Sequence, residues 1–169
     1  MEKDDKDFGI FDARYRALTI GIILAVTTVA FEGLAITTIA PSLAQKLNGL
    51  HLYGWIFSAF LLAQIIGTMI IGHQINKRGV FASFIVSILL FVIGIVIAAT
   101  SVNMYMLIAG RLLQGFGAGA IITCVYYSIT LGYPDQLRPK ILAMFSSAYV
   151  LPALIGPYIA GLIAEFLSW

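Results

Sequence analysis

Long apolar runs separated by short polar joints dominate the pattern of hydrophobic and polar positions along this chain. Five runs are long enough to cross a hydrocarbon core of about 30 Å, which takes about 20 helical residues. Lipid cannot satisfy an open backbone, and the runs lack the alternation of a membrane barrel, so each is predicted to be an α-helix. The five predicted membrane spans lie near residues 17–43, 53–72, 80–101, 104–129 and 140–166.

Ordinary helix breakers occupy the joints between these runs. The joints read Asn48-Gly49, Lys77-Arg78-Gly79, Ser101-Val102-Asn103 and Tyr133-Pro134-Asp135. Residues 1–15 are rich in charge and are predicted to form a short N-terminal tail. Residues 16–169 are then predicted to form one membrane domain, an all-α bundle of five transmembrane helices.

Composition supports a bilayer environment, because hydrophobic residues make up 60% of the chain, charged residues make up 11%, and the mean hydropathy is +0.97. A soluble domain carries about a quarter charged residues. The net charge is only +2, and the basic residues form no patch, which argues against nucleic-acid binding. A single cysteine and two separated histidines offer neither a disulfide nor a metal site, so no metal or cofactor is expected. No nucleophile–base pair or phosphate loop indicates an enzyme.

Lysine and arginine lie almost entirely on one side of the predicted membrane. Eight of the ten flank the N-terminus and the joints after the second and fourth runs: Lys3, Lys6, Arg14, Arg16, Lys77, Arg78, Arg138 and Lys140. Cytoplasmic ends of membrane helices carry this excess of positive charge. The N-terminus is therefore predicted to be cytoplasmic and Trp169 to face outward. Because an odd number of spans leaves the fifth without a partner, the chain is interpreted as part of a longer protein.

Glu32 lies inside the first apolar run, where a carboxylate costs a few kcal/mol on insertion scales. Such a residue usually faces a cavity or a partner, and it is a candidate to bind and release a proton. Arg111 is the only basic residue deep in a run. At a rise of 1.5 Å per residue, Glu32 and Arg111 lie roughly 15 Å and 11 Å below the outer ends of their helices. Pairing is therefore possible, and a fixed structural salt bridge is the alternative interpretation.

Other polar and small residues carry less specific signals. Glycines after Arg111, including Gly115, would let helix backbones approach closely. Pro152 and Pro157 would kink the fifth helix or free a carbonyl to line a cavity. Three further intramembrane residues could contact substrate or could instead hydrogen-bond between helices: Gln64, Tyr126 and Tyr127.

Several of these segments resemble the N-terminal half of a major facilitator superfamily transporter, in particular the fourteen-helix drug:proton antiporter branch. Residues 31–41, with Glu32 at the place of an aspartate, are similar to the first-helix motif of that branch. Residues 110–119, with Arg111, Gln114 and Gly115, match its fourth-helix motif. The resemblance covers roughly residues 14–169 and implies that Arg111 takes part in proton coupling. It also implies that the chain forms five helices of the six-helix N-terminal bundle, without the sixth helix and without the C-terminal half of the transporter.

Two further motifs are similar to those of the family but depart from them. The loop from Gly72 to Gly79 keeps both glycines and Lys77, whereas Asn76 replaces the usual aspartate. The fifth-helix motif that distinguishes exporters is represented by Gly156, Pro157 and Gly161, whereas Ala160 replaces a glycine and Pro152 lies where another glycine is usual.

Together these features favour a multi-pass plasma-membrane transporter that exports small amphipathic or cationic molecules in exchange for protons, by alternating access. Its expected partners are a small-molecule substrate, protons, the lipid bilayer and the missing half of the same transporter. Two alternatives stay open: a dedicated symporter or exporter of one metabolite, and a membrane scaffold that transports nothing.

Overall fold

The structure, a computed structural model, describes residues 10–13, 15–150, 152–155 and 158. In this part of the chain five α-helices and one short 3-10 helix follow one another, and no strand occurs. Their bounds are α1 Arg16–Lys46, η1 Leu50–Leu52, α2 Tyr53–Arg78, α3 Val80–Ala99, α4 Met104–Gly132 and α5 Arg138–Ser147.

Within the described residues, four predicted spans correspond to helices that are long and apolar enough to cross a membrane. These are α1, the segment Leu50–Arg78 with α2, α3 and α4. The breaks fall at the predicted joints. Gly79 alone separates α2 from α3 with φ 80°, a value that a residue without Cβ adopts freely. The Asn103 side chain caps α4 by accepting a hydrogen bond from the Met106 N–H at 2.9 Å.

Two bounds differ from the sequence prediction. The second helix does not end near residue 72 but continues to Arg78, because no proline interrupts it and Ile75 is buried against α4. The fifth helix is not continuous: α5 has 10 residues and ends at Ser147, and a turn at Ala148–Tyr149 precedes further helical residues. That turn lies four residues before Pro152, whose ring clashes with the carbonyl four positions earlier. The remainder of the predicted fifth span, including Pro157, lies outside the described residues.

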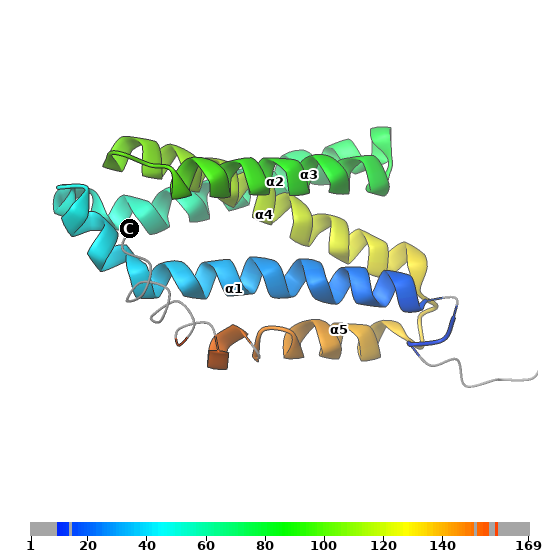
Figure 1. The fold of residues 1–169 in the computed structure, drawn as a ribbon. Coiled ribbons are helices and arrows are strands. Elements are labelled where there is room, and N and C mark those ends of the chain that lie inside the picture. The colour runs from blue at the N-terminus through cyan, green and yellow to red at the C-terminus, as the bar shows by residue number, and fades with distance from the viewer. Residues whose placement is uncertain (1–9, 14, 151, 156–157, 159–169) are drawn as a thin grey trace, which may run out of the picture.

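Helix α4 packs most closely against α2 and α3, whereas α1 lies beside this group and α5 lies along α1 (Figure 1). Glycine makes the α2–α4 contact possible. A Cβ at Gly115 would overlap the Phe60 backbone, and a Cβ at Gly119 would overlap the Gln64 backbone. Small residues allow helix backbones to approach in this way in a membrane. The core therefore has α4 at its centre, and α1 is the helix more loosely joined to it.

Buried apolar side chains join α1 to the bundle at two levels. At one end Ile22 and Val26 pack with residues of α4 and α5. At the other end Ile36 and Ala40 pack with Ile56 of α2 and with residues at the start of α4. Between these two levels lies the one acidic residue of α1.

Candidate functional site

Glu32 of α1 and Arg111 of α4 form an ion pair in the middle of the bundle. The Arg111 side chain is 2% exposed and the Glu32 side chain is 15% exposed. Equal depth in adjacent helices brings the two charges together, as the rise per residue predicted. The possible pairing inferred from the sequence is thus confirmed.

Arg111 has further partners on α2 and α4. Its Nε donates to the Ile56 carbonyl at 3.2 Å, and its Nη1 donates to Gln114 Oε1 at 2.9 Å. The guanidinium carbon also lies 4.2 Å from the centroid of the Phe60 ring, a cation–π contact. A guanidinium has five N–H donors and no acceptor, so a buried arginine needs such a set of partners.

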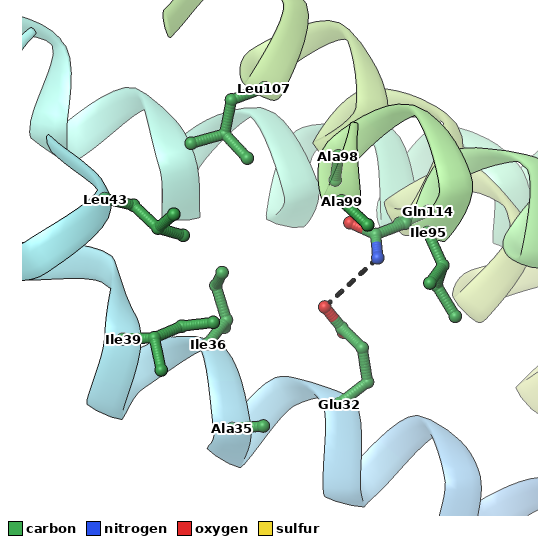
Figure 2. Close-up of a pocket in the computed structure, with 10 residues that line it drawn as sticks. All are labelled: Glu32, Ala35, Ile36, Ile39, Leu43, Ile95, Ala98, Ala99, Leu107 and Gln114. Atoms are coloured by element: carbon green, nitrogen blue, oxygen red, sulfur yellow. Dashed lines mark hydrogen bonds between the residues drawn. The ribbon is translucent and has the colours of Figure 1, made fainter. Parts of the chain in front are cut away.

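Gln114 connects the two charged residues. Besides accepting from Arg111, it donates from Nε2 to Glu32 Oε1 at 3.3 Å. Figure 2 shows Gln114 of α4 and Glu32 of α1 facing each other across this hydrogen bond. Gln114 is 3% exposed, so its amide has little access to water. Its place in the fourth-helix motif pointed to a role, whereas its partners follow only from the structure.

The carboxyl group of Glu32 is only partly satisfied. All of its hydrogen bonds within the described part of the chain reach Oε1, and Oε2 is buried without a partner. An unpaired buried polar atom is costly, and it commonly marks a place for a water, an ion or a ligand group. Glu32 therefore has a free acceptor in addition to the ion pair.

A cavity of about 160 Å³ adjoins Glu32 and Gln114 (Figure 2). It is almost wholly apolar apart from these two residues, and it extends toward the end of the bundle that holds the C-terminus of α1. Its other lining residues come from α1, α3 and α4: Ala35, Ile36, Ile39, Leu43, Ile95, Ala98, Ala99 and Leu107. Such a space suits a small group that is apolar on most of its surface and polar at one point.

The loop-motif residues lie far from this ion pair. Asn76 follows Ile56 by 20 residues on the same helix, which corresponds to about 30 Å along the axis. Asn76 and Lys77 are exposed at the α2–α3 corner, and Gly72 is partly buried near Thr123 of α4. They form a separate feature at the other end of α2.

None of the three polar cavity candidates lines the cavity beside Glu32. Gln64 is partly buried on α2, and Tyr127 packs against a small cluster of buried apolar residues of α2 and α4. The Tyr126 ring lies 5.2 Å from the Phe145 ring of α5 and is about half exposed. Gly156, Pro157 and Gly161 lie outside the described residues.

Two partners of Arg111 carry no signal in the sequence. The Ile56 carbonyl is a backbone atom, so its side chain gives no signal. Phe60 is one of eleven phenylalanines and carries no local mark either. Among the residues that the structure describes, no group of three histidine, cysteine or acidic side chains could hold a metal ion.

The geometry defines a helical membrane bundle with an acid–base pair buried at mid-depth. Residues 18–169 match the Major Facilitator Superfamily, and the chain belongs to this family, whose members are transporters and not enzymes. The superfamily inferred from the motifs is thereby confirmed.

Similar curated proteins include multidrug efflux pumps and fungal transporters. The chain is 33% identical over 150 residues to the multidrug efflux pump SdrM of Staphylococcus aureus, covering 89% of this chain and 34% of that protein. It is 30% identical over 153 residues to the MFS-type transporter opaD of Aspergillus ustus, covering 90% of this chain and 26% of that protein. Multidrug resistance protein 3 of Bacillus subtilis is 24% identical, with 93% of this chain and 31% of that protein covered. The chain thus spans about a quarter to a third of the length of these relatives. No solved structure matches it.

Proposed function

We propose that this chain is part of a proton-coupled secondary transporter that exports small amphipathic or cationic molecules. The observation that carries the proposal is the Glu32–Arg111 ion pair, buried at mid-depth, with a free Glu32 oxygen beside an apolar cavity. Ionisable residues inside a membrane are expensive and usually mark ion or substrate pathways. The similarity to proteins named as multidrug efflux pumps supports export in particular.

Competition at Glu32 would couple the proton to the substrate. The ionised carboxylate attracts a cationic group of the substrate, whose apolar part fits the neighbouring cavity. A proton on Glu32 removes that attraction and weakens the ion pair with Arg111. Proton and substrate would thus bind in turn rather than together, which is what exchange requires.

The bundle would work with a second half of the same transporter, and the two halves would rock about a site between them. We propose that the N-terminus lies in the cytoplasm, because lysine and arginine are in excess on that side of the predicted membrane. The plasma membrane is the location that we propose for the protein. Membership of the fourteen-helix branch rests on the motifs around Glu32 and Arg111.

A dedicated exporter of one metabolite is the second candidate function. It is favoured by a relative named the Acurin A biosynthesis cluster MFS-type transporter of Aspergillus aculeatus, which is 27% identical. Efflux tests with structurally unrelated lipophilic cations separate the two candidates. A multidrug exporter moves several of these compounds, whereas a dedicated one moves none or a single one.

Replacement of the proposed proton carrier tests the function. In vesicles containing the full-length protein, Glu32→Gln should reduce efflux driven by an imposed pH gradient to the background of empty vesicles, because an amide cannot exchange a proton. Glu32→Asp should retain part of the activity, and the protein level should stay unchanged. Efflux by Glu32→Gln at the wild-type rate would sink the role of Glu32 as proton carrier.

A further inference from the structure

The partners of Arg111 divide sharply between charged and neutral groups. Among the residues that the structure describes, its single charged partner is Glu32 on α1. Its neutral partners in the same part of the chain lie on α2 or α4: the Ile56 carbonyl, Gln114 Oε1 and the Phe60 ring. Arg111 is therefore attached to its own side of the bundle independently of α1.

Gln114 is the only side chain among these neutral partners that accepts a hydrogen bond from the same Nη1 atom that meets Glu32. It sits three residues after Arg111 on α4, and helical residues three apart face the same side. Its amide nitrogen donates to Glu32, and its amide oxygen accepts from Arg111. The ion pair and the helix together fix the orientation of this amide.

When Glu32 is neutral, Arg111 depends more strongly on the hydrogen bond to Gln114. A buried guanidinium keeps its charge at all accessible pH values and must retain acceptors. Once the carboxylate is protonated, its attraction for Arg111 falls, whereas the Ile56 carbonyl still accepts from Nε and Gln114 Oε1 still accepts from Nη1. Glu32 has no comparable neutral support among the described residues, since its hydrogen bonds reach only Arg111 and Gln114.

We propose that Gln114 is a positioning residue that holds the Arg111 guanidinium in place while Glu32 is neutral. Arg111 then stays with α2 and α4, and α1 is the element released when the ion pair weakens. The looser packing of α1 and the cavity between it and α3 and α4 fit this division. The inference rests on the proposed proton cycle at Glu32, because that cycle is what neutralises the carboxylate.

A double-mutant cycle on the full-length protein tests the positioning role. Gln114→Leu keeps the approximate size of the side chain and removes its acceptor. With Glu32 present it should lower the apparent melting temperature modestly, because Arg111 keeps its ion pair. Combined with Glu32→Gln, it should lower the melting temperature by about 3 °C or more beyond the sum of the two single effects. Gln45→Leu is the matched control, since Gln45 is exposed on α1, and its effect should add simply.

A relocated carboxylate supplies the second arm of the test. In the Glu32→Gln background, Gln114→Glu should give Arg111 a charged partner again and restore the melting temperature well above that of Glu32→Gln with Gln114→Leu. Simple additivity in the cycle, or no recovery with Gln114→Glu, would overturn the proposal. Efflux measurements separate this proposal from the proposed function. The relocated carboxylate should restore stability without restoring pH-driven efflux. Efflux by Glu32→Gln alone would count against the role of Glu32 as proton carrier and not against the positioning role of Gln114.

Discussion

At the scale of single residues, the site depends on charges that the membrane would otherwise exclude. Arg111 is almost fully buried, and Glu32 supplies the opposite charge. Removing one partner of a buried pair leaves an uncompensated charge, which typically costs about 3–5 kcal/mol. Gly115, close to this ion pair, lets the backbone of α4 approach the backbone of Phe60. The Phe60 ring in turn contacts the Arg111 guanidinium. The ion pair and the close helix contact therefore support each other.

We predict that Gly115→Ala destabilises the full-length protein by about 1–3 kcal/mol, the usual cost of overpacking. The added Cβ would overlap the Phe60 backbone, which can move only if α2 shifts away from α4. A drop in apparent melting temperature and a loss of pH-driven efflux should follow. Gly54→Ala is the matched control, since a Cβ at Gly54 meets nothing within 4 Å in the described bundle. Equal stability of the two variants would show that the α2–α4 contact is not tight.

At the scale of elements, α1 is anchored at its N-terminal end by a small polar cluster of Thr19, Tyr133 and the Ile10 carbonyl. Thr19 Oγ1 donates to the Ile10 carbonyl at 2.7 Å and lies 2.7 Å from the Tyr133 hydroxyl. Because a carbonyl only accepts, Tyr133 is the donor to Thr19. Burial raises the pKa of Tyr133, so its hydroxyl keeps its proton at neutral pH. The cluster thus ties α1 to the end of α4.

We predict that Tyr133→Phe destabilises the protein by about 0.5–1.5 kcal/mol, the net contribution of a typical hydrogen bond. The Tyr15–Tyr133 ring stacking, with centroids 5.3 Å apart, should survive the change. Thermal unfolding of the full-length protein measures the effect, with Tyr105→Phe as a control because Tyr105 is 74% exposed. An unchanged melting temperature for Tyr133→Phe would mean that this cluster does not anchor α1.

Sequence patterns predicted the helices better than their lateral arrangement. Glu32 and Arg111 could be paired in advance because the rise per residue fixes depth in a membrane helix. The Phe60 contact and the α3 wall of the cavity depend on how helices are placed side by side, which depth does not determine. Pro152 predicts a kink in the fifth helix. The structure places the interruption at Ala148–Tyr149, because the proline ring clashes with the carbonyl four residues earlier.

At the scale of the whole molecule, orientation in the membrane rests on the distribution of charge. The exposed α2–α3 corner carries Lys77 and Arg78, whereas the corner between α1 and α2 carries only Lys46. The first corner should therefore be cytoplasmic and the second should face outward.

We predict that a membrane-impermeant thiol reagent labels Leu50→Cys in intact cells but labels Asn76→Cys only after the membrane is opened. Both positions are exposed at helix corners. The native thiol of Cys124 should contribute little background because it is buried. The opposite labelling pattern would reverse the proposed topology.

The most direct test of the account counts the protons that Glu32 releases when a cation binds. Calorimetric titration of the full-length protein with tetraphenylphosphonium, in two buffers of different ionisation enthalpy, gives binding and proton release together. At a pH low enough for Glu32 to carry a proton, the wild-type protein should release protons on binding, and Glu32→Gln should release none. Asp135→Asn, a change at an exposed carboxylate outside α4, should behave like the wild type. Binding to the wild type without proton release, or equal release from Glu32→Gln, would contradict the account.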